Sequence, residues 1–234
     1  MKKFLIIFIL MLVGMQANAE YFETNVNMAN FWQKNGKDVQ KVEEVAARII
    51  NANKLDKHIP VEVVRNNKIP NAQASFYTKK VYVYTGLLPY INNDDELAYI
   101  LSHEMVHCLD FYDGILKALT AMKFNSKSYE IKADLAGIDL MVKAGYNPIA
   151  AICIQKRFLG ETYWDIGLGI THPKASKRMF ESYKHIYNNY PWALKSDMVK
   201  DINYQNFTYV AEKEINNFHH KQKQREARRK IEDL

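Results

Sequence analysis

The stretch 97–109, which reads LAYILSHEMVHCL, decides how the rest of the chain is interpreted. His103 and His107 are four residues apart, so on a helix both imidazoles project from one face and can bind one metal ion. Glu104 follows the first histidine and would lie beside that ion, where a carboxylate can take a proton from water without coordinating the metal. The spacing therefore predicts a metal site with two histidine ligands and Glu104 as the general base.

The remaining residues of this stretch are apolar on nearly every side, which predicts a buried helix. A chance HExxH pattern on an ordinary helix is the alternative. Two imidazoles and a carboxylate buried without partners would cost several kcal/mol, and metal binding would compensate that cost. Asn93 and Asp94 are expected to cap the helix, with further acids in its first turn.

A third protein ligand is needed, because a catalytic zinc ion takes three protein ligands and one water. Asp113 stands where the third histidine of an HExxHxxGxxH pattern would fall, so that pattern is absent. Glu130 is the candidate ligand instead, and Asp134 follows one turn later on the same helix face. Asp134 could then accept an N–H from a ligand histidine. A capping charge near a helix start is the alternative role for Glu130.

The chain as a whole predicts an α+β fold, a mainly helical zincin-type metalloprotease domain over residues 20–209 with a small antiparallel β-sheet. A helical stripe of apolar residues covers 38–53, and short β-branched or alternating runs predict strands. The expected strands are 60–64, 72–76 and 81–86, with a turn at Lys79-Lys80. The expected helices after the first are 93–109, 114–124, 128–144, 148–159 and one that begins at Pro173.

Residues 1–19 are expected to be a signal peptide, and an uncleaved membrane anchor is the alternative. Lys2 and Lys3 precede an apolar run over 4–13, and Ala17-Asn18-Ala19 offers a small-x-small cleavage pattern. No later run approaches eighteen apolar residues, so no transmembrane segment is expected after leader removal. The expected location is the periplasm, with secretion as the second choice.

The charge and cysteine content bound the partners and the redox state. The net charge of +6 falls to +4 when the two leader lysines are removed, and interspersed acids argue against nucleic-acid binding. Residues 210–234 form a charged tail that is expected to be helical or frayed, with His219-His220 on its surface. Cys108 and Cys153 could form a disulfide in an oxidising compartment or remain buried thiols, and the sequence leaves both open.

A set of short motifs occurs in a fixed order over about residues 38–187. They are Asn71-Ala72-x-Ala74, Val81-x-Val83-x-Thr85-Gly86-Leu87-Leu88, Asp95-Glu96-Leu97-Ala98, His103-Glu104-x-x-His107, Glu130-x-x-Ala133-Asp134-x-x-Gly137, Ala144-Gly145-Tyr146-x-Pro148 and Thr171-His172-Pro173. The ordered set resembles the HExxH gluzincin metalloproteases of the HtpX-type and CAAX prenyl endopeptidases, and most closely their soluble periplasmic BepA-like members. Tyr77-Thr-Lys-Lys80 replaces the Pro-Gly-Gly turn of that family, and the charged tail stands where larger members carry a helical repeat domain.

The resemblance implies one Zn2+ per chain, held by His103, His107 and Glu130. It also places the Thr171-His172-Pro173 loop near the zinc, where His172 could donate to the oxyanion or occupy the open metal position. A structural role ahead of Pro173 is the alternative for His172. Arg178 matches a family arginine that orients the site, and a surface salt bridge is its alternative.

These observations predict a metalloendopeptidase for unfolded or misassembled envelope proteins, acting in protein quality control. Its expected partners are protein or peptide substrates and the outer-membrane assembly machinery. A zinc-stabilised periplasmic chaperone or scaffold for outer-membrane protein assembly, with little proteolysis, is the alternative. A third hypothesis keeps the protease chemistry but makes the chain a secreted, toxin-like enzyme.

Overall fold

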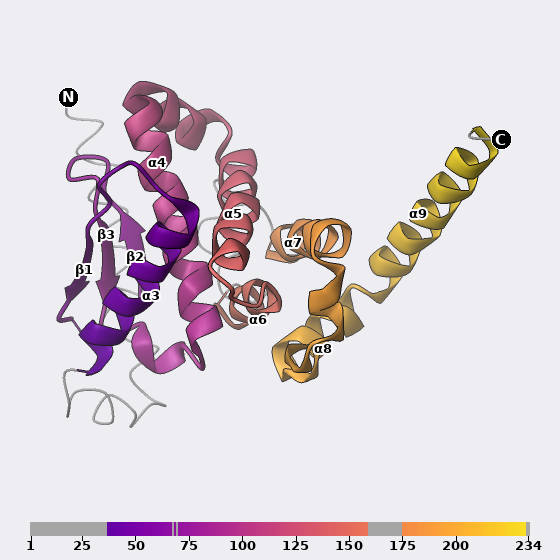
Figure 1. Cartoon of the computed structure of the whole chain (residues 1–234), viewed down its shortest axis with the longest axis horizontal. Coiled ribbons are helices and arrows are strands. Elements are labelled where there is room, and N and C mark those ends of the chain that lie inside the picture. Colours follow the sequence, from indigo (N-terminus) through magenta and orange to yellow (C-terminus); the bar gives the residue numbers. More distant parts are fainter. Residues whose placement is uncertain (1–36, 67, 69, 159–174, 233–234) are drawn as a thin grey trace.

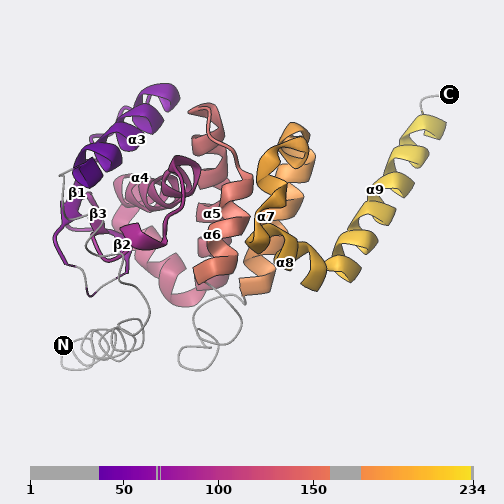
Figure 2. The same cartoon turned by 90° about the horizontal axis from the view of Figure 1, so that it is seen from below.

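The structure is a computed structural model that describes residues 37–66, 68, 70–158 and 175–232. Its helices and strands, in chain order, are α3 (Lys37–Asn53), β1 (Val61–Val64), β2 (Ala72–Ala74), β3 (Val81–Tyr84), η1 (Leu88–Tyr90), α4 (Asp94–Phe124), α5 (Ser126–Lys143), α6 (Ile149–Phe158), α7 (Ala175–Asn189), η2 (Pro191–Lys195), η3 (Asp197–Lys200), α8 (Ile202–Val210) and α9 (Glu212–Glu232). The predicted α+β class, mainly helical with one small sheet, is confirmed. Both views show the sheet and α3 at one side, followed by α4, α5 with α6, α7 with α8, and finally α9 (Figures 1 and 2).

The sheet has the strand order β1-β3-β2 and is mixed. β2 and β3 form the expected antiparallel hairpin, and Lys79 takes a positive φ of 56° in the turn between them. β1 pairs with β3 in parallel, so the expectation of a wholly antiparallel sheet is wrong for this pair. The physical reason is that the segment after β1 carries the chain across to the far edge of β3, which makes β2 an edge strand and leaves β1 parallel to β3.

The first half of α4 is the centre of the hydrophobic core. Asn93 caps this helix, because its side-chain oxygen accepts a hydrogen bond from the backbone N–H of Glu96 at 2.9 Å. The helix then passes between the sheet and α5, and it buries apolar side chains on several sides. At Gly114 the backbone leaves helical geometry, with φ 160° and ψ 102°. This break separates the two helices that the sequence predicts over 93–109 and 114–124.

The charged tail is helical over Glu212–Glu232, and Figure 1 shows α9 extending away from the other helices. Its first turns are anchored, since His219 Nε2 lies 2.9 Å from the hydroxyl of Tyr183 and the ring of Phe218 packs against Tyr187. His219 is therefore partly buried, which differs from the expected surface position, whereas His220 is exposed. The boundaries at 19/20 and 209/210 stay predictions. No described helix is both long enough and apolar enough to cross a membrane.

Cys108 and Cys153 are free, buried thiols, which answers the question that the sequence left open. Burial raises the pKa of Cys108 to about 12 and raises that of Cys153 further above its ordinary value. We therefore expect neither thiol of the folded protein to react with Ellman's reagent at pH 8, and both to react in denaturant without reductant. Absence of reactive thiols in denaturant would contradict this, because it would reveal a disulfide.

Candidate metal centre

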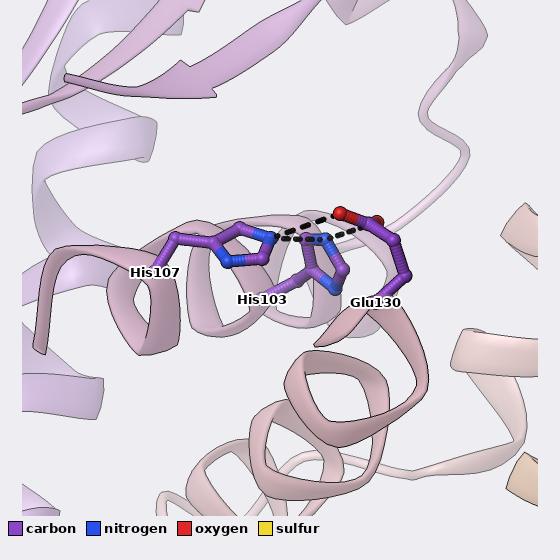
Figure 3. Close-up of side chains that lie close together, drawn as sticks. All are labelled: His103, His107 and Glu130. Carbon is purple, nitrogen blue, oxygen red and sulfur yellow. Dashed lines mark hydrogen bonds and ion pairs between the residues drawn. The ribbon is translucent and has the colours of Figure 1, made fainter. Parts of the chain in front are cut away.

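Two neighbouring helices bring His103, His107 and Glu130 together. The histidines lie on one face of α4 and Glu130 reaches toward them from α5 (Figure 3). The two Nε2 atoms are 3.1 Å apart, and each lies 3.6 Å from one carboxylate oxygen of Glu130. Three ligand atoms bound tetrahedrally to zinc at ~2.0–2.1 Å would lie about 3.3 Å apart. The geometry thus fits a small tetrahedral cation with no rearrangement beyond a few tenths of an ångström.

The position of Glu130 in its helix rules out the capping role. α5 begins at Ser126, and its first turn contains no acidic residue. Glu130 lies one turn further along and points across to α4 instead. Its pKa is about 2, because burial is opposed by the hydrogen bond and charge of His103 and by Arg178. The residue is therefore an anion at neutral pH, as a metal ligand has to be.

Gly137 allows α5 to approach α4 this closely. A Cβ on Gly137 would lie 3.0 Å from the backbone nitrogen of His103 and 3.1 Å from its Cα. Any larger residue would press on the backbone that carries the first histidine, and backbone atoms cannot rotate away as a side chain can.

Gly137→Ala is therefore expected to destabilise the protein by about 1–3 kcal/mol and to weaken zinc binding, because α5 must move outward and take Glu130 with it. Thermal unfolding and a zinc competition titration would measure the two effects. A variant with the wild-type melting temperature and zinc affinity would show that the close approach has no energetic consequence.

Asp134 is buried behind the first histidine. Its Oδ1 lies 3.0 Å from Nδ1 of His103, which directs Nε2 of that ring toward the candidate metal position. Asp134 also accepts hydrogen bonds from the hydroxyl of Tyr99 at 2.6 Å and from Nε and Nη2 of Arg178 at 2.7 and 2.6 Å. Burial raises the pKa of Asp134, but Arg178 and His103 outweigh burial and hold it well below its usual range.

Arg178 comes from α7 and contacts two acidic residues of the centre, Glu130 and Asp134. Its Nη1 lies 3.3 Å from Oε2 of Glu130, in addition to the bidentate pair with Asp134. The guanidinium is largely buried, so the alternative of a surface salt bridge is wrong for Arg178. Its charge offsets two buried carboxylates and fixes their positions relative to α7.

Glu104 lies next to the sheet. Its Oε2 accepts a hydrogen bond from the backbone N–H of Ala74 in β2 at 2.8 Å. Burial raises the pKa of Glu104 to about 7, helped by the nearby Glu130 and opposed by His103. A carboxylate with such a pKa can both accept and return a proton near neutral pH.

The two histidines differ in protonation. Burial lowers the pKa of His103, but the hydrogen bonds that its ring donates to Asp134 and Glu130 outweigh burial and raise it to about 10. Burial and the neighbouring His103 lower the pKa of His107 to about 3. Without a cation, the centre therefore holds a proton on His103, and a bound metal ion would displace that proton.

Tyr129 is a residue of the centre that the sequence reading missed. Its ring stacks on the His107 imidazole, with centroids 4.9 Å apart and an interplanar angle of 28°. Nδ1 of His107 has no hydrogen-bond partner among the described residues. Nδ1 of His103, by comparison, lies 3.0 Å from Oδ1 of Asp134. Ring stacking thus restrains His107. In the sequence, the one signal for this role is that Tyr129 directly precedes the candidate ligand Glu130.

Tyr129→Leu is expected to lower zinc affinity about tenfold, a loss typical of removing an orienting contact, whereas Tyr129→Phe keeps the stack and the affinity. Phe111→Leu is the matched control, since Phe111 and Tyr129 belong to the same small apolar cluster. Competition with a chromophoric chelator measures the affinity. Equal losses in both leucine variants would assign the effect to general packing.

A cavity of about 250 Å³ opens beside the centre. Tyr99, His103, Glu104, Glu130 and Arg178 form its polar wall, and its remaining lining is Pro70, Asn71, Ala72, Leu87, Ile100, Ile154, Gln155 and Phe158. The cavity therefore joins the candidate metal position to the segment that enters the edge strand β2.

Three other histidines were considered from the sequence. His172 lies outside the described residues, so its role as a donor or latch stays a prediction. His219 and His220 lie on α9, and within the described part of the chain the grouping of ligand atoms suited to a metal is His103, His107 and Glu130.

The geometry agrees with comparisons to known proteins. Residues 33–111 match the model of peptidase family M48. The matched segment contains the sheet, His103, Glu104 and His107, and ends before Glu130. The chain is also 30% identical over 128 residues to the mitochondrial metalloendopeptidase OMA1 of Arabidopsis thaliana. That alignment covers 42% of this chain and 26% of the relative, so the chain spans about a quarter of the relative's length.

Proposed function

We propose that this chain is a zinc-dependent metalloendopeptidase. The observation that carries the proposal is the convergence of His103, His107 and Glu130 on one point, with Glu104 beside it and an edge strand alongside. The M48 match and the similarity to a metalloendopeptidase support the same chemistry. Glu104 further favours catalysis over a purely structural zinc site, because folding alone would not need this residue.

Different residues of the chain would have different roles in hydrolysis. Zinc, when bound, acts as a Lewis acid that activates water and polarises the scissile carbonyl. Glu104 accepts the proton of the attacking water and delivers it to the leaving amine. Asp134 keeps His103 in the tautomer that presents Nε2, and Arg178 offsets the charge of Asp134 and Glu130.

The edge strand β2 offers a place for an extended substrate. Ala74 directs its N–H away from β3 and toward Glu104, whereas the neighbouring Ser75 donates to Lys80. Backbone groups on that outer side of β2 can pair with a peptide in strand conformation, which would lead it past the cavity. Peptide and protein substrates fit this arrangement better than small molecules do.

The substrate class, the location and the subfamily are also part of this proposal. The predicted leader and the motif resemblance support unfolded or misassembled envelope proteins as substrates, a periplasmic location and a place among BepA-like members. Outer-membrane assembly machinery is the corresponding partner class. A zinc-stabilised chaperone that seldom cuts is the alternative, and the position of Glu104 in the cavity favours the protease.

Cleavage of unfolded casein tests the proposal. Purified protein is treated with a zinc chelator, assayed, and assayed again after stoichiometric zinc is restored. We expect loss and recovery of endoproteolytic fragments. Binding of casein without fragments in the zinc-restored sample would support the chaperone alternative and exclude the protease.

A further inference from the structure

The second half of α4 exposes an unusual concentration of apolar side chains. Of the ten most exposed large apolar residues in the described part of the chain, five lie within thirteen positions. They are Tyr112, Ile115, Leu116, Met122 and Phe124, and we name 112–124 the exposed segment. Leu116 is 81% exposed and Phe124 is 77% exposed. Single exposed apolar residues are ordinary, but such a cluster on one short helix marks an interaction surface.

The exposed segment turns its large apolar side chains outward, unlike an ordinary surface helix. Small residues face the protein, since Ala118 is buried and Ala121 packs against the cluster of Phe111 and Tyr129. The large residues face outward, whereas a helix of a soluble domain normally turns its largest apolar side chains toward the core. The outward face is thus suited to an apolar environment that the described residues do not supply. Figure 1 shows the turn from α4 into α5 at the outer edge of the molecule.

The charge around the exposed segment indicates what that environment is. The exposed segment carries Lys117 and Lys123 against one acid, Asp113, and Lys127 follows it. All three lysines are exposed, and Nζ of Lys123 lies 5.2 Å from the ring centroid of Phe124. Apolar and aromatic anchors interleaved with lysines are typical of helices that lie in the interface of an anionic bilayer. A protein partner is less well matched, because lysine is depleted from protein–protein interfaces.

We propose that the exposed segment docks on the surface of a bilayer containing anionic lipids. Leu116, Phe124 and their apolar neighbours enter the boundary between headgroups and acyl chains, while the lysines contact lipid phosphates. The segment is too short to span a bilayer, so it lies on the membrane. This docking goes beyond the proposed proteolysis. It would hold the helix that carries His103 and His107 close to the membrane surface.

Vesicle flotation with the full chain tests the docking, using phosphatidylcholine vesicles with and without phosphatidylglycerol. Leu116→Glu with Phe124→Glu is compared with Ile202→Glu with Tyr209→Glu, a pair of apolar residues on α8 that are also mostly exposed. Both double variants add two negative charges. We expect binding to anionic vesicles to fall at least about tenfold in the first variant and to remain near wild type in the second. Pure phosphatidylcholine should bind the wild type more weakly.

Three outcomes would overturn the docking. These are wild-type protein that does not float, equal losses in both double variants, or no loss in the first. A change in oligomeric state of the first variant without vesicles, measured by light scattering, would instead assign the surface to a second copy. Casein cleavage in solution should be unchanged in the first variant, so failure of the protease proposal and failure of the docking are distinguishable.

Discussion

Glu104→Gln is expected to lower the rate of casein cleavage by about 10²–10⁴-fold while leaving zinc bound, because the variant loses the proton acceptor but none of the three ligands. Glutamine can still accept the hydrogen bond from Ala74 through its amide oxygen, so the junction of α4 with β2 is kept. Cleavage kinetics and elemental analysis of the same preparation give the two readouts. Glu43→Gln, an exposed glutamate on α3, controls for handling. Equal cleavage by wild type and Glu104→Gln would exclude Glu104 as the base.

Glu104→Gln should also change how the stability of the metal-free protein depends on pH. Because burial raises the pKa of Glu104 to about 7, the folded metal-free protein binds this proton more tightly than the unfolded chain. Its stabilising contribution is complete below the unfolded pKa of 4.5 and is lost as pH rises toward 7. Metal-free Glu104→Gln should therefore gain stability relative to wild type across this interval. Denaturant unfolding at pH 5 and pH 8 measures the difference, and a constant difference at both pH values would contradict the shift.

Glu130→Ala is expected to weaken zinc binding by more than about 100-fold and to abolish cleavage, because it leaves the ion with two histidine ligands. The fold should survive, since Arg178 keeps its bidentate pair with Asp134 when Glu130 is removed. Competition titration gives the affinity and circular dichroism reports the fold.

The matched control for this variant is Glu43→Ala, which removes the same side chain from the surface of α3. Glu104→Gln provides a second comparison, because it should lose cleavage and retain zinc, whereas Glu130→Ala should lose both. Stoichiometric zinc in Glu130→Ala would remove Glu130 from the ligand set, whatever the activity of the variant.

Local spacing was enough to predict the parts of the centre that belong to one helix. His103, Glu104 and His107 follow from the helical repeat alone, and Asp134 follows from Glu130 by one turn. The approach of α5 to α4 is a tertiary feature. The HExxH pattern requires a third ligand but does not say which helix supplies it. The structure supplies the approach through Gly137, which the family motif contained without an explanation.

The features that the sequence did not predict depend on contacts between distant segments. Tyr129 reaches His107 only because α5 lies across α4, and aromatic residues carry no metal-ligand signal of their own. The hydrogen bond from Ala74 to Glu104 uses a backbone group, which no side-chain pattern encodes. The parallel pairing of β1 was missed for a related reason. The residue pattern of a short strand identifies it as a strand but does not say at which edge it joins the sheet.

Arg178 also affects when the centre can assemble during biogenesis. Asp134 is joined to Tyr99 on α4 and to Arg178 on α7, so the centre draws on a span of eighty residues along the chain. A chain emerging from a ribosome or a translocation pore presents both histidines and Glu130 well before α7. Until α7 arrives, Asp134 and Glu130 lack the guanidinium that holds them in position. We expect such a chain to hold zinc poorly, so that a newly made chain would complete its candidate metal centre only after α7 has packed in place.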